Sequence, residues 1–463
     1  MFRFFNASFP SRTVFLGVSE ALLVMLAFVG AMLARLGTND ALVMLNYEQG
    51  FLKVVVVSGI FVLSMYYFDL YDSNVLSNRR EVLTRVIQVL GTVSILMAVL
   101  YYVYPSLQLG RGIFVIGFCF VALLLLCWRR LFLFVNTLPS LAERAVIFGD
   151  GPLADLLAVE LESRPELGLR VVAQVSEEVN KDRSLSTISG APNTDLAQWV
   201  KTQRVNRIIV AMNDRRGRLP VEDLLSLKSR GVMIQDGPQV YEAITGKVPL
   251  ESLRPGWLLF SDGFHVSKRL LLYSRVFSCF VAAVGILLSL PLIPFVVIAI
   301  KLTSPGPILY WQKRVGRDGR TFLCCKFRSM RVDAEANTGA TWAVENDPRV
   351  TSVGRLLRSA RLDEIPQLWL VLKGDMNLIG PRPERPEFVE RFIGKIPFYH
   401  LRHTIRPGIT GWAQVRYKYG NSDDDAREKL KYDLFYIKNT SPGLDLLILF
   451  HSIKIVLLGR GAQ

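Results

Sequence analysis

Two adjacent carboxylates, Asp363 and Glu364, lie in the segment RLDEIPQLWLVLKGDMNLIGPRP, between arginines and a Pro-Arg-Pro turn. Neighbouring carboxylates repel each other, so the pair indicates a local need: a metal ion, a phosphate, or a nucleophile with its base. The alternative is a solvated helix face, which would be preferred if these two residues stood alone. The residues around the pair therefore decide which chemistry it performs.

Basic side chains gather on the N-terminal side of the pair. Residues 301–331 contain eight Lys or Arg and a single acid, Asp318. Within this stretch Lys326 and Arg328 lie in the apolar context CCKFRSM. Their spacing of two would point both side chains the same way from a strand. So much positive charge directly after an apolar segment favours anionic head groups as partners.

Further cations lie close to the pair on both sides. Arg355 and Arg358 have helical spacing and would stack on one face near the carboxylates. Cations this close keep an Asp ionised, which a nucleophile requires. Residues 380–383 (GPRP) form a rigid turn that presents Arg382, a bidentate phosphate ligand. These features together fit two substrates, an anionic nucleotide and a phosphorylated lipid.

The composition fits such partners. The chain has 463 residues, is 51% hydrophobic and still carries a formal charge of +15, which is typical of a membrane protein with a basic polar part. The basic excess predicts phospholipids, nucleotides or phosphorylated lipids as partners. No nucleic-acid-binding motif is present, so we expect no nucleic acid partner. The five cysteines form no C-x-x-C pair, as in a protein facing the cytosol.

Residues 1–138 are predicted to form a four-helix transmembrane region. Each of its apolar segments is close to the roughly 20 residues that a helix needs to cross a bilayer. The segments are 13–34, 51–68, 86–104 and 112–128. Flanking arginines place both ends of this region in the cytoplasm by the positive-inside rule. Because the segments contain almost no ionisable residues, we expect them to anchor and dimerise the chain and not to transport.

A Rossmann-like α/β domain is predicted at residues 139–250. It begins with an apolar strand followed by Gly149-x-Gly151-x-x-Ala and a helix, the entry of a dinucleotide fold. Further strands are predicted at 170–175, 207–212 and 232–236, with helices between the later ones. Gly149 and Gly151 are candidates for nucleotide binding, but one such motif is weak evidence, and a packing or regulatory role is preferred.

A long apolar segment at 270–302 is predicted to enter the membrane and return on the same side. Pro291 and Pro294 interrupt it, and a proline forces a kink in a helix. Both flanks are basic, so both prefer the cytoplasm. The alternative is a fifth spanning helix with a tolerated kink, which would export everything after residue 301.

At this point the sequence resembles a known family. The motifs SPGPILYWQKRVGRDGRTF, KFRSM, LDEIPQLWLVLKGDMNLIGPRPE and RPGITGWAQV are similar to those of bacterial sugar transferases, the monotopic polyprenyl-phosphate phosphoglycosyl transferases. The resemblance covers 268–463 and implies an α-rich monotopic catalytic domain there, after a linker at 251–267. The N-terminal regions resemble the large subgroup that initiates polysaccharide synthesis. The segment RPGWLLFSDGF at 254–264 is similar to the exopolysaccharide branch.

The resemblance implies a covalent two-step reaction. Asp363 would attack the β-phosphate of a UDP-sugar and release UMP. Glu364 would assist proton removal from undecaprenyl phosphate, which then takes the phosphosugar. Mg²⁺ near Asp363 and Glu364 would offset the phosphate charge. Four matched cations would hold phosphate oxygens: Lys326, Arg328, Arg358 and Arg382. Asp375 lies in the G-D-M stretch of the family, where a structural role is at least as expected as a catalytic one.

The resemblance also implies a cellular setting and partners. The chain would be a multi-pass protein of the bacterial inner membrane, with its catalytic domain on the cytoplasmic face. It would form a homodimer and supply downstream glycosyltransferases in exopolysaccharide, capsule or O-antigen synthesis. The sugar itself is not specified by any residue that we can identify.

Two alternative functions stay open. A membrane-bound nucleotide-sugar dehydratase would need a second dinucleotide fold and a Tyr-x-x-x-Lys pair, and the sequence contains no such pair. A scaffold or regulator of polysaccharide assembly would tolerate loss of Asp363. The charged segment 419–439, which contains Tyr432 and Asp433, is predicted to be a cytosolic helix.

Overall fold

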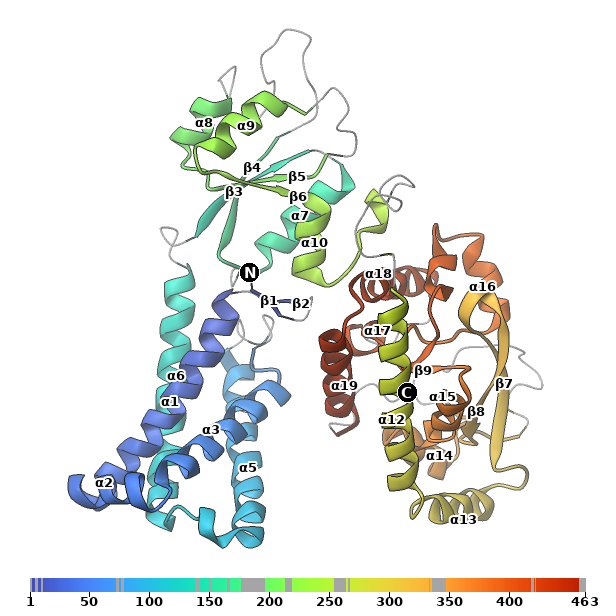
Figure 1. The fold of residues 1–463 in the computed structure, drawn as a ribbon, viewed down its shortest axis with the longest axis horizontal. Coiled ribbons are helices and arrows are strands. Elements are labelled where there is room, and N and C mark those ends of the chain that lie inside the picture. The colour runs from blue at the N-terminus through green and yellow to red at the C-terminus, as the bar shows by residue number, and fades with distance from the viewer. Residues whose placement is uncertain are drawn as a thin grey trace. The chain divides into compact units, whose positions relative to one another are not determined.

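The chain folds into two compact units, formed mainly by residues 9–240 and 241–463 (Figure 1). The structure is a computed structural model, and it describes residues 2–4, 7–9, 11–71, 75, 79–137, 142–149, 151–164, 167–175, 196–212, 219–253, 264, 267–332, 334, 347–417, 420 and 422–457. Most of the predicted linker, and all of the 254–264 motif except Phe264, lie outside these residues. A small sheet of β1 (Phe2–Phe4) and β2 (Ala7–Phe9) lies at the N-terminus.

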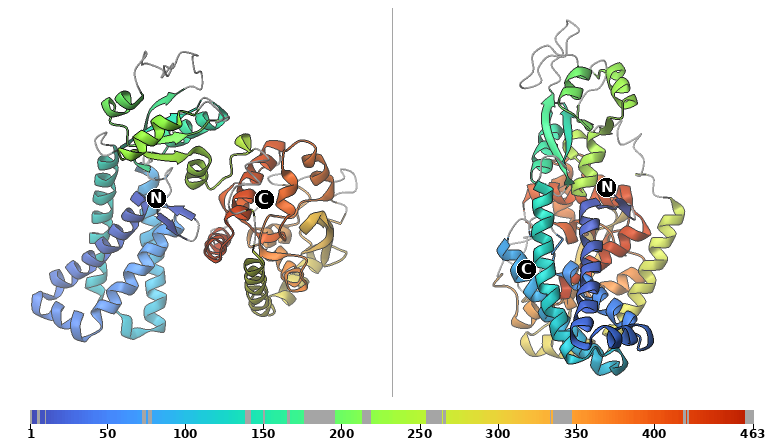
Figure 2. Two further views of the ribbon diagram at one scale, coloured as in Figure 1. Left: turned by 45° about the horizontal axis from the view of Figure 1, so that its top comes forward. Right: turned by 90° about the vertical axis from the view of Figure 1, so that its left-hand side faces the viewer.

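The N-terminal unit begins with long apolar helices. They are α1 (Ser11–Leu36), α2 (Thr38–Tyr47), α3 (Gly50–Tyr67), α5 (Arg79–Val103) and α6 (Arg111–Thr137), with a short 3-10 helix η1 (Pro105–Leu107) before α6. By length and composition α1, α3, α5 and α6 could each cross a membrane. The four predicted segments lie in these helices, except that two of them extend one residue past the C-terminal ends of α3 and α5. Helices α1 and α6 lie side by side (Figure 2).

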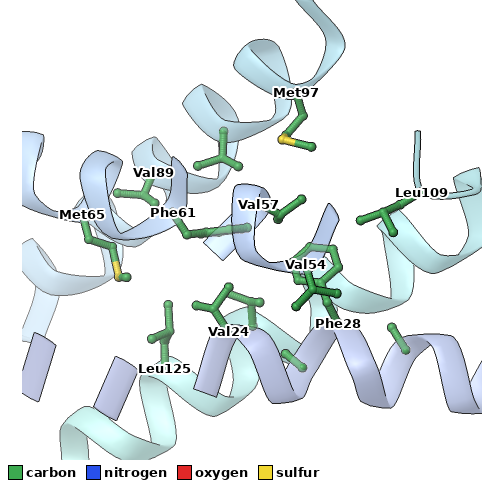
Figure 3. Packing of buried hydrophobic residues seen from close by; sticks show 14 of the residues in the cluster. Val24, Phe28, Val54, Val57, Phe61, Met65, Val89, Met97, Leu109 and Leu125 are labelled. Atoms are coloured by element: carbon green, nitrogen blue, oxygen red, sulfur yellow. The ribbon is translucent and has the colours of Figure 1, made fainter. Parts of the chain in front are cut away.

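The helices share one apolar core, shown in Figure 3. Phe28 of α1 and Phe61 of α3 pack with ring centroids 6.1 Å apart, and Met97 of α5 is also buried in this core. One ionic contact differs from the expectation of apolar segments. Glu20 and Arg129 are buried, and Arg129 Nε lies 2.6 Å from Glu20 Oε1. This pair links α1 to α6, which suits an anchoring bundle.

A parallel α/β domain follows in the same unit, as predicted. Its sheet has the strand order β4-β3-β5-β6. The elements are β3 (Glu143–Phe148), α7 (Pro152–Glu162), β4 (Leu169–Val175), α8 (Leu196–Thr202), β5 (Arg207–Val210), α9 (Val221–Ser229) and β6 (Met233–Asp236). Helix α10 (Gly237–Thr245) follows and contains the boundary between the two units. Gly149 has φ +137, and a Cβ there would lie 2.7 Å from the carbonyl carbon of Ala211. Close backbone packing therefore accounts for Gly149, while Gly151 precedes α7 in an extended conformation.

The first long helices of the second unit are two apolar ones, α12 (Lys268–Ser289) and α13 (Ile293–Thr303). The predicted interruption at Pro291 is confirmed, and α13 turns sharply away from the axis of α12 (Figure 1). Helix α12 is also long and apolar enough to cross a membrane. Its first half nevertheless packs on the folded domain through two hydrogen bonds. Arg275 Nη2 donates to the Leu372 carbonyl at 2.9 Å, and Ser278 Oγ accepts from Leu378 N at 3.1 Å.

The rest of the second unit is α-rich. A short 3-10 helix, η4 (Leu250–Ser252), precedes α12. The elements after α13 are β7 (Leu309–Val315), η5 (Arg317–Gly319), β8 (Thr321–Phe327), α14 (Ser352–Ser359), η6 (Leu362–Glu364), α15 (Gln367–Lys373), β9 (Asn377–Ile379), α16 (Pro386–Ile393), η7 (Tyr399–His403), β10 (Gly408–Thr410), α17 (Trp412–Arg416), α18 (Asp423–Asn439) and α19 (Pro442–Leu457). Strands β7 and β8 form an antiparallel hairpin, and β9 pairs with β10 in parallel. Helix α18 falls within the helix predicted at 419–439.

Candidate active site

The carboxylate pair lies in the single 3-10 turn η6, between α14 and α15. Arg361, directly before this turn, has φ 56 in the left-handed region, which ends α14 and redirects the chain. Asp363 and Glu364 are only 5% and 7% exposed. The alternative of a solvated helix face is therefore excluded, because a buried carboxylate pair needs partners that offset its desolvation.

Glu364 forms most of the close ion pairs with the cations at this site. Its Oε1 lies 2.8 Å from Lys326 Nζ and 2.8 Å from Arg382 Nη2, with Arg361 Nη1 at 3.6 Å. Burial alone would raise the pKa of Glu364, but Lys326, Arg382 and Arg361 outweigh it and hold this pKa well below its usual range. Glu364 is therefore an anion that holds three cations together.

Asp363 has a different environment from its neighbour. Lys326 Nζ lies 3.9 Å from its Oδ2, and the carboxylate accepts no hydrogen bond within the described part of the chain. Burial raises the pKa of Asp363 although Lys326 opposes this, and the charge of Glu364 raises it further. The sequence argument that cations favour the charged form is thus outweighed by burial. A more basic carboxylate without a hydrogen-bond donor is a better nucleophile once it is ionised.

The cations come from several elements. Lys326 lies on β8, where it pairs with Tyr310 of β7, and Arg382 lies in the turn after β9. Arg358, in the last turn of α14, donates from Nε to Ser329 Oγ at 3.0 Å. It is close enough to lower the pKa of Asp363. The structure therefore brings Lys326, Arg358 and Arg382 to the pair.

Arg328 does not join this group. It is 6% exposed and donates from Nη2 to the carbonyl and hydroxyl oxygens of Ser304, at 2.7 and 2.9 Å. The hairpin hydrogen bonding continues to Arg328, whose backbone N donates to the Ile308 carbonyl at 2.8 Å, but its long side chain reaches Ser304 and not the carboxylate pair. Arg328 instead stabilises the turn after α13 through its hydrogen bonds to Ser304. Sequence reasoning placed Arg361 among the arginines that lead to the pair but gave it no role in the site, although its position three residues before Glu364 indicates this contact.

Mg²⁺ in phosphoryl-transfer sites is usually held by one or two carboxylates together with substrate phosphates. In the described part of the chain no group of three or more His, Cys, Asp or Glu could hold a metal alone. Oε1 of Glu364 already accepts hydrogen bonds from Lys326 and Arg382. Of the two carboxylates, Asp363 would therefore be the one with more room to hold such an ion.

Helix α14 can pack closely against the segment at Ser329 because Gly354 has no side chain. A Cβ at Gly354 would lie 1.9 Å from the Ser329 carbonyl oxygen. We expect Gly354→Ala to push α14 and its Arg358 away, costing about 1–3 kcal/mol of stability and lowering activity. Thermal unfolding and turnover measure this. Gly394→Ala is the control, because the nearest atom to its Cβ is 3.8 Å away, and an equal effect of both changes would contradict the prediction.

Comparison with known proteins matches both units. Residues 269–459 match the family model described as bacterial sugar transferase, and residues 66–223 match one described as CoA-binding domain. The first region contains all the site residues described above, and the second includes the strands β3, β4 and β5.

Several curated proteins are similar to the chain. UDP-N-acetylgalactosamine-undecaprenyl-phosphate N-acetylgalactosaminephosphotransferase from Aeromonas hydrophila is 45% identical over 49% of the chain and 52% of its own length. Undecaprenyl-phosphate glucose phosphotransferase from Komagataeibacter xylinus is 32% identical over 70% of the chain and 60% of its own length. UDP-galactose-lipid carrier transferase from Erwinia amylovora is 30% identical over 73% of the chain and 72% of its own length.

The chain thus matches about half to three fifths of the length of the first two of these relatives. Its match to the Erwinia protein covers most of both chains, and the family model spans the whole region around the carboxylate pair. The chain belongs to the bacterial sugar transferase family.

Proposed function

We propose that the protein transfers a phosphosugar from a UDP-sugar to undecaprenyl phosphate, which gives undecaprenyl-diphospho-sugar and UMP. The observation that carries this proposal is the buried Asp363 carboxylate, free of hydrogen-bond donors in the described part of the chain and bordered by the cations that Glu364 collects. Such a site suits attack on a phosphorus atom whose oxygens need positive charge around them. The names of the relatives support the same reaction class.

In the first step, an oxygen of the Asp363 carboxylate attacks the β-phosphorus of the UDP-sugar. The bond from this phosphorus to the bridging oxygen breaks, and UMP leaves with the electron pair. Asp363 then carries the phosphosugar as an acyl phosphate. In the second step, a phosphate oxygen of the lipid attacks the same phosphorus and Asp363 leaves as a carboxylate. One phosphoanhydride replaces another, so positioning and charge neutralisation are the main contributions.

The other residues assist these steps. Lys326, Arg358 and Arg382 would hold the oxygens of the diphosphate. The low pKa of Glu364 makes it a weak base, so we assign it first to orienting Lys326 and Arg382. Its role in removing a proton from the lipid phosphate stays a prediction, as does phosphate binding by Arg328. Bound Mg²⁺ would supply further neutralisation of phosphate charge, with Asp363 as its protein ligand.

A pocket of about 490 Å³ lies in the same unit as the carboxylate pair, and none of the site residues described above lines it. It lies between the end of α13 and the start of α14. Its lining combines hydroxyl groups, one cation and a few apolar side chains: Thr303, Ser304, Pro305, Arg331, Val332, Val350, Thr351 and Ser352.

We propose that α12 and α13 form a re-entrant element on the cytoplasmic side of the bacterial inner membrane. Both helices pack on the same domain, α12 through Arg275 and α13 through Ile300, which lies against Phe327. A spanning helix would carry its far end about 30 Å away across the bilayer core. Leu288 and Phe295, on either side of the bend, are 70% and 72% exposed, as expected for side chains in lipid.

This placement predicts the accessibility of two positions. Cysteines introduced at Lys268, the first residue of α12, and at Arg320, after α13, should both resist a membrane-impermeant thiol reagent in intact cells. Both should react in inside-out vesicles, because both flanks are cytoplasmic. The unchanged chain gives the background from its own cysteines. Labelling of the Arg320→Cys protein in intact cells would show instead that α12 and α13 cross the membrane.

The reaction is tested by UMP release from the purified protein with Mg²⁺, undecaprenyl phosphate and a panel of UDP-sugars. The panel should include UDP-glucose, UDP-galactose and UDP-N-acetylgalactosamine, because the names of the relatives differ in the sugar. We expect UMP with at least one donor, which would identify the sugar. A folded protein that releases no UMP with any donor would favour the scaffold alternative.

A further inference from the structure

The turn that carries Arg382 is held through its backbone. Four consecutive carbonyls each accept a hydrogen bond from a different residue outside the turn. Pro381 O accepts from Gly408 N at 3.0 Å, Arg382 O from Arg402 Nη2 at 3.0 Å, Pro383 O from Arg314 Nη1 at 3.0 Å and Glu384 O from Val315 N at 2.9 Å. The direction in which Arg382 projects is therefore set by its neighbours.

The donor to Arg382 belongs to a buried ion pair. Arg402, in η7, is 5% exposed, and its Nη2 lies 2.8 Å from Oδ2 of Asp433 in α18, which is 2% exposed. Arg402 Nη1 also donates to the hydroxyl of Tyr399. Burial raises the pKa of Asp433 to about 6, against the effect of Arg402. A buried ion pair often contributes little to the net stability of a protein. Stability alone therefore does not account for this pair, and a role in positioning is the alternative.

We propose that Arg402 and Asp433 are positioning residues for the transfer reaction. Asp433 holds Arg402 Nη2 against the Arg382 carbonyl, and Arg382 Nη2 in turn lies 2.8 Å from Glu364 Oε1. The chain of contacts runs from α18 through η7 to the carboxylate pair. It fixes a cation at the place where the phosphate oxygens are bound. This inference rests on the proposed function.

The expected effect is on turnover. A displacement of about 1 Å in a positioned group can cost about 100-fold in rate. Asp433→Asn, which removes the charge that holds Arg402, should therefore lower kcat by about this factor.

Helix α19 provides a matched control for this change. Asp445 is 1% exposed, and its Oδ1 accepts a hydrogen bond of 2.7 Å from the Tyr436 hydroxyl. Burial raises the pKa of Asp445 to about 6. Its carboxylate thus resembles that of Asp433 in burial and in pKa, but it bonds to Tyr436 instead of an arginine that contacts the turn. Asp445→Asn should leave turnover close to that of the unchanged chain.

A second variant separates folding from positioning. Replacing Arg402 by Met together with Asp433 by Leu removes both buried charges, and apolar replacements of this kind are often neutral or stabilising. The protein should unfold at or above the temperature of the unchanged chain. Turnover should still fall by about 100-fold, because the donor to the Arg382 carbonyl is lost.

A double-mutant cycle then shows whether the effect passes through Arg382. In an Arg382→Met background, Asp433→Asn should cause no further loss of activity, since the group that it positions is already gone. The full-length protein is assayed in lipid nanodiscs by UMP release. Equal turnover of Asp433→Asn and Asp445→Asn, full activity of the apolar double variant, or an undiminished Asp433 effect without Arg382 would each overturn the inference. Absence of UMP release by the unchanged protein would refute the proposed function itself.

Discussion

Replacing Asp363 by Asn is expected to reduce UMP release by about 10⁴-fold or more, the scale seen when a covalent nucleophile is removed. The amide keeps the shape of the side chain but cannot form the acyl phosphate. The folded protein should be no less stable, because burial disfavours the carboxylate and the amide carries no charge. Thermal unfolding and UMP release measure the two effects separately.

The covalent step can be tested without the lipid acceptor. The unchanged protein with UDP-sugar alone should release at most one UMP per chain and gain the mass of the phosphosugar, whereas Asp363→Asn should do neither. Asp375→Asn is the control from the same sequence block. Its Oδ2 lies 2.9 Å from Lys373 Nζ, and this lysine is not one of the cations around the carboxylate pair. Equal UMP release by the Asp363→Asn and unchanged proteins would exclude the aspartyl intermediate.

Replacing Lys326 by Met is expected to lower turnover by about 10²–10³-fold, as for the loss of one preorganised charge donor. Lys326 makes the largest contribution that lowers the pKa of Asp363, so this pKa should rise further in the variant. The reaction needs the carboxylate form, and activity falls as the pH drops through the pKa. The acidic limb of the pH profile should therefore shift to higher pH.

Lys313→Met is the matched control, because Lys313 is an exposed cation on β7 of the same hairpin. It should keep both the turnover and the pH profile of the unchanged protein. If Lys326→Met lost activity without any shift of the acidic limb, Lys326 would bind the substrate but would not tune Asp363. If both variants lost activity equally, the effect would come from the overall charge of the hairpin.

Much of the fold could be predicted from local patterns. The lengths of the apolar segments located α1, α3, α5 and α6, because a bilayer demands about 20 apolar residues per helix. The alternation of strands and helices indicated the parallel sheet, and Pro291 marked the break between α12 and α13. Each of these signals depends on neighbours in the chain. The Glu20–Arg129 pair joins residues 109 apart, and no local pattern indicates it.

The site was predicted less completely. The sequence pointed to the carboxylate pair and to Lys326, Arg358 and Arg382. It assigned Arg328 to the same cluster, but this side chain donates to Ser304 instead. The support of Arg382 by Arg402 and Asp433 depends on three segments far apart in the sequence, so spacing gave no indication of it.

By itself, the sequence determined the kinds of groups in this protein: a pair of adjacent carboxylates, several cations close to it, and helices long and apolar enough to cross a membrane. Only the tertiary structure decided how the positive charge of the cations is distributed between the two carboxylates. Asp363 and Glu364 are neighbours with nearly the same chemistry, yet Glu364 receives the cations and Asp363 is left with a raised pKa. Desolvation and Coulomb interactions depend on distances between distant segments, and only folding sets those distances.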